Sequence, residues 1–325
     1  MTARARPISE FSAISQLEAL FRSASSQVEL GIGDDAAVLK ASGRSVWTVD
    51  TAVEHVHFER AWLSLAELGF RSFQAAASDV SAMGGAPTAA LSSVIFPPDF
   101  AAAELNLLAR GQRAAARALG CAIVGGNLAR GAELSITTTV LGSVRRRPLL
   151  RSGARVGDEL WLCGELGLAA AGLRLLQGGR SRGTSAAERR ALRAFRRPQA
   201  LLAAGLELAR GAHAAIDISD GLAGDAGHLA QASGVELLID LAALSATLDP
   251  ALHRLAPRLA VAALDLALYG GEDYALLAAG PQRARPASAR VIGSVGKGRG
   301  VWLLDGQNRR RAGRGFEHSS GTKPR

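Results

Sequence analysis

The chain has 325 residues, 48% of them hydrophobic, and a formal net charge of +9 at pH 7. This length and apolar content are enough to bury two cores, so we expect two domains. No run of about 18 uncharged apolar residues is present, and the first ten residues lack the apolar stretch that a secretory signal needs. The sequence therefore indicates neither a membrane protein nor a secreted one, and we expect a cytoplasmic location.

The positive charge comes almost entirely from arginine, since only three of the 38 basic residues are lysines. The arginine clusters at 145–147, 189–190 and 309–311 are short and scattered, whereas a surface that stacks on bases would interleave such charges with aromatic residues. We therefore expect dispersed, solvated charge and no nucleic-acid partner. Small anionic substrates are compatible with the same positive field.

The first half of the chain alternates between strand and helix patterns. Residues 64–84 predict a helix, because Ser64 and Glu67 form a capping box and apolar residues follow at helical spacing. A second helix is expected to begin at Asp99, a good N-cap after two prolines, and to end at Leu119 before a glycine. Strands with β-branched, alternating character are predicted at 46–53, 121–126 and 133–144.

A basic segment at 145–158, which contains a proline and two glycines, separates this set of elements from a second one. We place the domain boundary there, giving domains of residues 1–147 and 148–325. The alternation of strands and helices predicts an α/β fold with two α/β domains. In the second domain, helices are expected near 166–177, 186–196, 199–211 and 221–233, and strands at 159–164, 214–218, 235–241, 274–279, 290–295 and 301–305.

The two cysteines, Cys121 and Cys163, each lie in an apolar segment. They have neither CxxC spacing nor a cluster of other metal-binding residues nearby. Buried free thiols are therefore predicted.

Aspartates beside glycines recur at predicted strand ends in both halves. In the first half, Asp34 and Asp35 follow two glycines, which is typical of a cation site or of an Asp-rich turn before a strand. Asp79 lies near the C-terminal end of an apolar helix, where its charge opposes the macrodipole. A metal ion would offset this penalty, and simple exposure is the alternative.

The strand at 46–53 carries Thr48 and Asp50 among apolar residues, and buried polar groups are costly unless they face a site. His55 and His57 would then share one face of a strand. No third ligand with zinc-like spacing is present, so we favour a substrate contact or a structural histidine over a zinc site.

Three further motifs combine glycines with polar residues. Gly126 and Asn127 follow an apolar strand, where a turn could cradle phosphate with its backbone amides. Asp217 and Asp220 lie where a strand ends and a helix opens, and Asp220 alone could be an N-cap. Glu272 stands in a similar glycine-rich loop before a strand.

Many carboxylates with glycine turns, without a nucleophilic triad, indicate metal-held phosphates. The sequence has no P-loop and no protein-kinase motif set, so a nucleotide must be bound in another way. Phosphoryl transfer between two anions fits this pattern, because magnesium neutralises their repulsion. An acceptor phosphate with a second pKa of about 6 is already ionised at neutral pH, so a general base is not required. No residue is predicted to act in catalysis other than by positioning and metal assistance.

Taken together, these motifs resemble thiamine-monophosphate kinases, a family in the superfamily that also contains aminoimidazole ribonucleotide synthetase and selenophosphate synthetase. The resemblance covers nearly the whole chain and rests on GIGDDAAV (31–38), the VDT and VHF elements (49–58), SDVSAMGG (78–85), GGNLARG (125–131), LRSG (150–153), IDISDGLAGDAGHL (216–229), GGEDY (270–274) and GFEH (315–318).

The resemblance implies ATP-dependent phosphorylation of thiamine monophosphate to thiamine diphosphate, with ATP and Mg²⁺ as cofactors. It also implies a homodimer in which the N-terminal domains form a shared β-barrel, with the C-terminal domain covering the site. The implied metal positions are Asp35, Thr48, Asp50, Asp79, Asp217 and Asp220; the implied nucleotide contacts are Gly126, Asn127, Arg151 and Ser219; and the implied substrate contacts are His57, Glu272 and Phe316.

Two positions depart from the family pattern. The family usually has an acid where this chain has Asn127, and a hydroxyl where it has Val49. One magnesium site is therefore expected to be weaker or to depend on the phosphates of ATP. The alternatives to the kinase are another ATP-dependent synthetase of the superfamily and a catalytically weakened homologue that binds ATP or thiamine phosphate.

Overall fold

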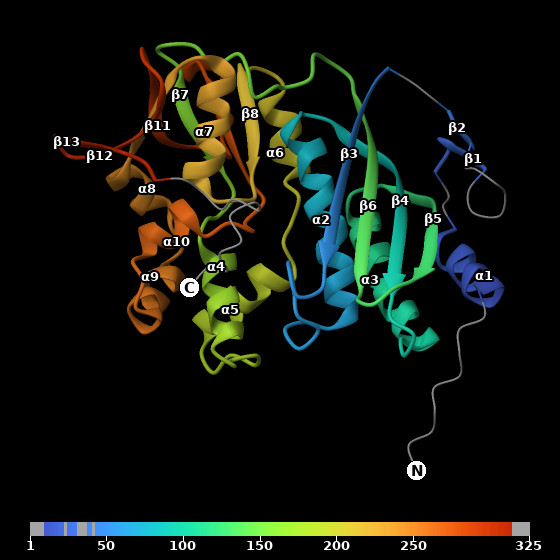
Figure 1. Cartoon of the computed structure of the whole chain (residues 1–325). Helices are drawn as coiled ribbons and strands as arrows, with labels where there is room; N and C mark the ends of the chain where they lie inside the picture. Colours follow the sequence, from blue (N-terminus) through green and yellow to red (C-terminus); the bar gives the residue numbers. More distant parts are fainter. Residues whose placement is uncertain (1–9, 23–24, 31–37, 41–42, 314–325) are drawn as a thin grey trace. The chain divides into compact units, whose positions relative to one another are not determined.

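The computed structural model describes residues 10–22, 25–30, 38–40 and 43–313. The chain divides into two compact units (Figure 1). The first comprises residues up to Val80 together with Gly85–Arg146, and the second comprises Ser81–Gly84 together with the residues from Arg147 onward. Within the described residues, no helix has the length and apolarity needed to span a bilayer.

The first unit is built on a four-stranded sheet with the order β3-β6-β4-β5. β3 pairs antiparallel with β6, and β6 antiparallel with β4. β4 and β5 are parallel, so the chain crosses between them through helix α3. The bounds are α1 Glu10–Phe21, β1 Val28–Leu30, β2 Val38–Leu39, β3 Arg44–Val53, α2 Leu65–Ala82, β4 Ala86–Phe96, α3 Ala102–Ala118, β5 Ala122–Arg130 and β6 Ser135–Val144.

Helix α2 begins as predicted. The backbone N–H of Ser64 donates to Glu67 Oε2 at 2.8 Å, and the backbone N–H of Glu67 donates to Ser64 Oγ at 3.3 Å, which completes the capping box. Helix α3 also ends as predicted, with Leu119 as its C-cap.

The predicted N-cap of helix α3 is wrong. The helix begins after Ala101, not at Asp99, and the backbone N–H of Ala101 donates to Glu104 Oε2 at 2.7 Å. The physical reason is the intervening turn, which buries Phe100 against Phe96 with the ring centroids 5.8 Å apart. The gain from burying this ring outweighs the local capping preference of Asp99.

Helices α2 and α3 cross at two glycines. A Cβ atom on Gly69 would lie 2.1 Å from the carbonyl oxygen of Leu108, and one on Gly111 would lie 2.0 Å from the carbonyl oxygen of Ala66. The two helix backbones are therefore in direct contact. The adjoining core packs Leu68, Leu105 and Leu108 of the helices against Val94 and Ile136 of the sheet.

No helix of the described part of the chain covers the opposite face of this sheet. Its strands alternate, so that Ile136 and Val140 of β6 are buried while Trp47 and Val49 of β3 are 65% and 62% exposed. Leu91 and Ile95 of β4 are also exposed. The sheet is thus apolar on both faces, which is unusual for a face in contact with water.

The second unit has a seven-stranded sheet with the order β13-β12-β9-β11-β7-β10-β8. The strand bounds are β7 Glu159–Cys163, β8 Ala214–Ile218, β9 Glu236–Asp240, β10 Ala275–Gly280, β11 Arg290–Gly296, β12 Gly300–Asp305 and β13 Asn308–Arg311. The helices are α4 Leu168–Gln177, α5 Ala186–Arg196, α6 Leu202–Leu208, α7 Leu222–Ser233, α8 Leu241–Thr247, α9 Pro250–Leu255 and α10 Ala263–Tyr269, with 3₁₀ turns at Ala256–Leu259 and Gln282–Ala284. The predicted mixed α/β composition is confirmed.

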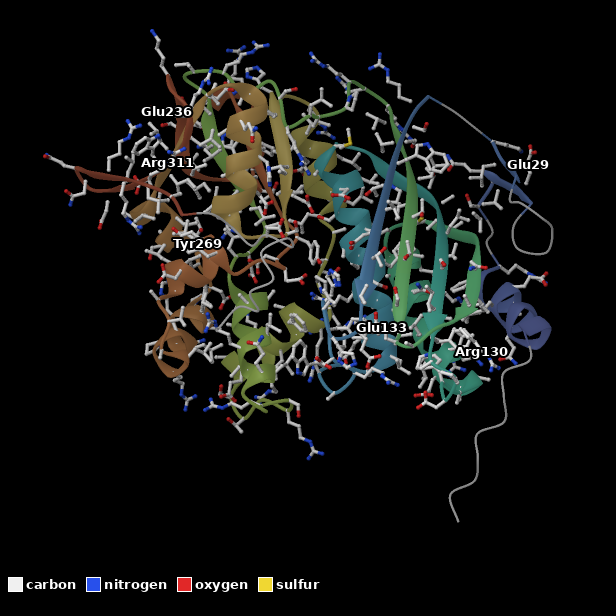
Figure 2. The ribbon with its side chains drawn as sticks, viewed as in Figure 1. Glu29, Arg130, Glu133, Glu236, Tyr269 and Arg311 are labelled. Carbon is white, nitrogen blue, oxygen red and sulfur yellow. The ribbon has the colours of Figure 1, made fainter. Side chains whose placement is uncertain are left out.

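The basic end of the chain is partly neutralised within the second unit. Arg309 Nη2 lies 2.7 Å from Glu236 Oε2, and the guanidinium of Arg309 lies 4.1 Å from the centroid of the Trp302 ring. Figure 2 shows Glu236 and Arg311 at this hairpin of β12 and β13. Arginine here packs as well as carries charge.

The prediction of two buried free thiols is confirmed. Burial raises the pKa of Cys121 to about 12, against a backbone hydrogen bond with Ala122 that lowers it. Burial also raises the pKa of Cys163 to about 11. Both thiols therefore stay protonated at neutral pH and are poor nucleophiles.

Candidate functional site

The junction of β8 and α7 gathers three aspartates in the second unit. Asp217 lies within β8 and is buried, and the chain then turns through Ser219 and Asp220 into α7. Gly221, not Asp220, is the N-cap of α7. The carboxylate of Asp225, inside the first turn of the helix, accepts the backbone N–H groups of Ser219 and Asp220, each at 3.0 Å.

The three carboxylates act on one another. The pKa of Asp225 is raised to about 7, first by burial and then by the charges of Asp220 and Asp217, while the backbone N–H groups of Asp220 and Ser219 oppose the rise. Like charges held this close favour either a shared proton or a cation. The donor set is all oxygen, which is the chemistry that Mg²⁺ prefers.

The glycine-rich loop that carries Glu272 packs against this junction. Strand β10 lies between β7 and β8 and is antiparallel to both, so its beginning meets the carboxyl end of β8. The backbone N–H of Glu272 donates to the carbonyl of Ser219 at 2.7 Å, and that of Tyr274 donates to the carbonyl of Ile218 at 2.8 Å. Two predicted motifs more than 50 residues apart in the sequence therefore form one site.

This loop has a strained backbone. Glu272 and Tyr274 adopt φ angles of +65° and +51°, in the left-handed region that costs a residue with a Cβ about 1–2 kcal/mol. Such conformations persist where the surrounding structure fixes them, and they cluster at functional sites. The hydroxyl of Tyr274 also donates to Glu272 Oε2 at 2.6 Å.

Asp273 is a residue of the site that the sequence analysis did not assign. Its carboxylate accepts the backbone N–H of Gly167 at 2.8 Å and that of Ala169 at 3.3 Å, at the N-terminus of α4. Gly167, the N-cap of α4, has no side chain to cap the helix. A glycine at this position was the only indication in the sequence that a distant residue caps α4. The partner lies 106 residues away, so local sequence could not identify it.

The pKa of Asp273 makes stability depend on pH. Burial raises it to about 7, against the two backbone N–H groups of Gly167 and Ala169 that lower it. The same carboxyl ionises near its ordinary value of about 4 in the unfolded chain, so between about pH 4 and pH 7 the folded protein binds more protons and the free energy of unfolding falls as pH rises.

We therefore expect the fall in the free energy of unfolding between pH 5 and pH 8 to be about 2 kcal/mol smaller in Asp273→Asn than in the wild type. Urea unfolding of both proteins at the two pH values measures the difference. Equal falls in the two proteins would contradict the assigned shift.

In the first unit, Thr48 and Asp79 lie together. Thr48 Oγ1 donates to Asp79 Oδ2 at 2.5 Å, which joins the edge strand β3 to helix α2. Asp50 is two residues after Thr48 in β3, so both side chains lie on the same face of the sheet. Asp50 Oδ1 accepts the backbone N–H of Thr51 at 2.8 Å. Three of the predicted metal positions thus share one side of the sheet, and their oxygens also fit a divalent ion.

The histidines are arranged differently from the prediction. β3 ends at Val53, so His55 and His57 lie in the following turn and not on one face of a strand. His55 has a φ of +66° and its Nδ1 lies 2.8 Å from Glu59 Oε2. His57 Nδ1 accepts the backbone N–H of Val53 at 3.1 Å, which fixes the orientation of the ring.

The turn predicted at Gly126 and Asn127 is wrong, because both residues lie inside β5, whereas their contact with the nucleotide stays a prediction. The strand continues through them because it pairs with β4, where Gly126 is opposite Ser92 and Asn127 is opposite Ser93. A Cβ atom on Gly126 would lie 1.8 Å from the carbonyl oxygen of Ser92, which explains the glycine.

Asn127 is exposed on the open face of the sheet. Val49, the other position that departs from the family pattern, lies on the same face. β5 and β3 are the two edge strands of the sheet, three strand spacings apart. At about 4.8 Å per spacing, Asn127 and Asp50 of one chain are separated by roughly 14 Å. A single ion cannot touch both residues within one chain.

The remaining predicted residues are Arg151, Asp35 and Phe316. Arg151 is exposed near the start of the second unit, and its backbone carbonyl accepts the hydroxyl of Ser233 at 2.9 Å. Asp35 and Phe316 lie outside the described residues. Among the residues that are described, no group of three or more His, Cys, Asp or Glu side chains has an arrangement that could hold a metal ion by itself.

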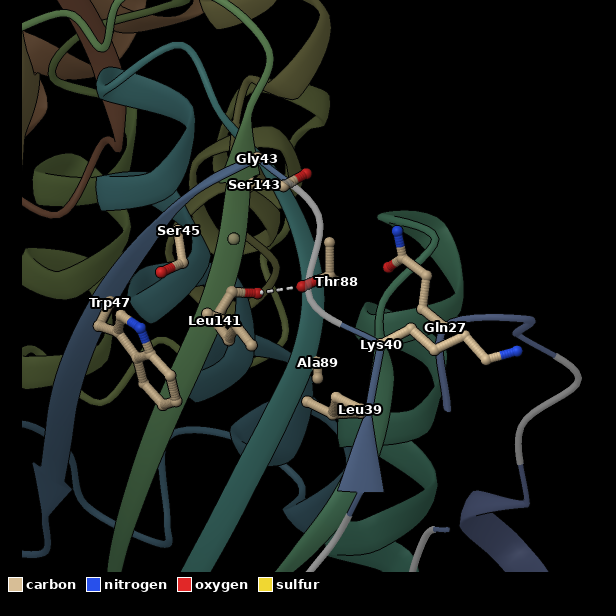
Figure 3. Close-up of a pocket in the computed structure, with 11 residues that line it drawn as sticks. Gln27, Leu39, Lys40, Gly43, Ser45, Trp47, Thr88, Ala89, Leu141 and Ser143 are labelled. Carbon is tan, nitrogen blue, oxygen red and sulfur yellow. Dashed lines mark hydrogen bonds between the residues drawn. The ribbon is translucent and has the colours of Figure 1, made fainter. Parts of the chain in front are cut away.

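An open depression of about 590 Å³ lies on the first unit, between the β1–β2 ribbon and the four-stranded sheet (Figure 3). Lys40, Trp47 and Thr88 are among the residues that line it, and Thr88 Oγ1 donates to the carbonyl of Leu141 at 3.0 Å. Among the described residues that line this depression there is no carboxylate.

Known proteins resemble both halves of the chain. Residues 33–144 match the family described as AIR synthase related protein, N-terminal domain, and residues 155–301 match the corresponding C-terminal domain. The chain is 38% identical to thiamine-monophosphate kinase of Mycobacterium tuberculosis over 285 residues, which cover 86% of this chain and 83% of that protein. It is 34% identical to the Aquifex aeolicus enzyme over 275 residues, 84% of this chain and 88% of that protein.

Solved structures agree with these relatives. Thiamine-monophosphate kinase from Stenotrophomonas maltophilia K279a superposes with a TM-score of 0.82 at 32% identity, covering 91% of this chain and 96% of that one. AaThiL complexed with AMPPCP and TMP superposes with a TM-score of 0.80 at 32% identity, covering 98% of this chain and 99% of that one. With sequence identity, both domain matches and the fold in agreement, the chain belongs to the thiamine-monophosphate kinase family.

Proposed function

We propose that this protein catalyses the ATP-dependent phosphorylation of thiamine monophosphate to thiamine diphosphate. The observation that carries the proposal is the convergence of Asp217, Ser219 and Asp220 with Glu272 in a protein of this family. A related structure contains both AMPPCP and TMP, which match the proposed nucleotide and substrate. We place the reaction in the cytoplasm.

The acidic residues would hold magnesium. Asp217 and Asp220 of the second unit, and Thr48, Asp50 and Asp79 of the first, present the oxygen atoms that such ions require, together with Asp35. When bound, magnesium supplies neutralisation of the repulsion between two phosphate groups. The pKa of Asp225 is raised mainly by burial and in part by the charges of Asp220 and Asp217, and a bound cation would relieve that second part.

The other proposed residues bind and orient the two substrates. Gly126, Asn127, Arg151 and Ser219 are assigned to the nucleotide, and His57, Glu272 and Phe316 to thiamine monophosphate. The acceptor phosphate, with a second pKa of about 6, is already ionised at neutral pH, so the chain need not remove a proton. The contribution of these side chains is to align the two phosphates and exclude other geometries.

A homodimer is part of this proposal. Trp47, Val49 and Leu91 are exposed on one face of the sheet, and exposed apolar patches of this kind mark interfaces. A second copy that covers it and pairs the edge strands would give the shared β-barrel, with the C-terminal domain covering the site.

The test is direct. Purified protein is mixed with ATP, magnesium and thiamine monophosphate, and thiamine diphosphate is followed by chromatography. Formation of the diphosphate supports the proposal. ATP turnover that requires a different co-substrate would identify a synthetase instead, and binding of both ligands without product would identify a weakened homologue.

Asn127 provides a prediction about the strength of the site. In Asn127→Asp we expect half-saturation by magnesium at a concentration several-fold lower, together with a higher turnover, because a carboxylate adds a full negative charge to a site that now has an amide. Steady-state rates over a magnesium titration measure this. An unchanged titration curve would remove Asn127 from the metal site.

A further inference from the structure

Hydrogen bonds of Glu272 and of its neighbour Asp273 fix the loop that carries Glu272. Its backbone N–H donates to the carbonyl of Ser219, its Oε2 accepts the hydroxyl of Tyr274 at 2.6 Å, and the next residue, Asp273, is bonded to the start of α4. The surrounding backbone is left-handed at Gly271, Glu272 and Tyr274. A loop of this kind, left to itself, would relax toward ordinary φ angles.

We propose that Asp273 and Tyr274 are positioning residues that hold the carboxylate of Glu272 ready for the cationic part of the substrate. This inference rests on the proposed function, since it concerns the same substrate. Asp273 fixes where the loop lies, and Tyr274 fixes how the carboxylate of Glu272 is turned.

Asp273 performs its part through two backbone donors. Gly167 and Ala169 give their N–H groups to its carboxylate, so the loop is tied to helix α4 at a point where the helix has donors without intrahelical partners. The positive end of the helix dipole adds to this attraction. The tie opposes the strain in the two residues that flank Asp273.

Tyr274 performs its part through its hydroxyl. The side chain is buried, with 9% of its surface exposed, so its position is fixed by packing. It donates to Oε2 of Glu272, which limits the directions in which this carboxylate can turn. A carboxylate oriented before binding loses less conformational entropy when the ligand arrives, which strengthens binding.

The experiment uses the full-length protein and five variants, which are three single substitutions described here and two variants at Glu272 described below. In Tyr274→Phe we expect KM for thiamine monophosphate to rise about 5–10-fold, with kcat and KM for ATP within about twofold of the wild type. In Asp273→Asn we expect KM for thiamine monophosphate to rise by a similar or larger factor. Asp240→Asn is the matched control, because Asp240 also accepts two backbone N–H groups at a helix start but has no link to Glu272.

A double variant tests whether Tyr274 acts through Glu272. If it does, Glu272→Gln combined with Tyr274→Phe has the same KM for thiamine monophosphate as Glu272→Gln alone. Multiplied effects in the double variant, or a wild-type KM in Tyr274→Phe, would overturn the inference. An inactive wild type would instead overturn the proposed function, so the two failures are distinguishable.

Discussion

Replacement of Asp217 by asparagine is expected to lower kcat for thiamine diphosphate formation at least about 100-fold, with folding retained. Asp217 is buried at the carboxyl end of β8, and its charge acts on Asp225. Asparagine keeps the shape and one oxygen of the side chain but removes the negative charge that a magnesium ion requires. The measurement is steady-state turnover over a range of magnesium concentrations.

The matched control is Asp240→Asn, which makes the same chemical change at a helix N-cap of the same unit. It is expected to turn over at the wild-type rate. Thermal unfolding of both variants separates loss of function from loss of fold. A wild-type kcat in Asp217→Asn would exclude this carboxylate from the reaction and, with it, the central part of the proposed metal site.

Replacement of Gly111 by alanine is expected to lower the free energy of unfolding by about 3 kcal/mol. The added methyl group would lie 2.0 Å from the carbonyl oxygen of Ala66, so α2 and α3 must move apart and the core beneath them loses contacts. The better helix propensity of alanine, worth about 1 kcal/mol, only partly offsets this loss. Urea unfolding measures the change.

A second helical glycine serves as the control. Gly227 lies in α7, and a Cβ atom there would have no neighbour within 4 Å. Gly227→Ala should therefore stabilise the protein by about 0.5–1 kcal/mol through helix propensity alone. If Gly111→Ala left the free energy of unfolding unchanged or raised it, as Gly227→Ala is expected to do, the helices would not pack as described.

Hydrophobic periodicity and capping residues predicted the helices and strands in which these signals are strong. The strand Ala214–Ile218 was predicted to the residue, and the helix at Leu65–Ala82 within two residues of each end. Strand β4 at Ala86–Phe96 was not predicted, because its alanines and serines have low strand propensity and it is held in place by its pairing with β5 and β6. The short helices between Leu241 and Tyr269 were missed for a similar reason, since their stability comes from packing.

For the candidate site, the sequence indicated which residue types matter better than how they are placed. Asp217, Ser219 and Glu272 were predicted as site residues from separate motifs, and the structure brings them together through the pairing of β8 with β10. The turn expected at Gly126 is a strand because β4 supplies a partner, which no local pattern reveals. Asp273 was missed because its partners, Gly167 and Ala169, are more than 100 residues away in the sequence.

The two enclosed cysteines make the protein suitable for site-specific labelling. Because Cys121 and Cys163 are buried and stay protonated, maleimide dyes should leave the native chain unmodified. Single cysteines introduced at exposed Arg113 and Arg193 would then each accept a fluorophore, one in each compact unit. Energy transfer between the two dyes would report whether the distance between the units changes as nucleotide and thiamine monophosphate are added, without removal of any native residue from the site.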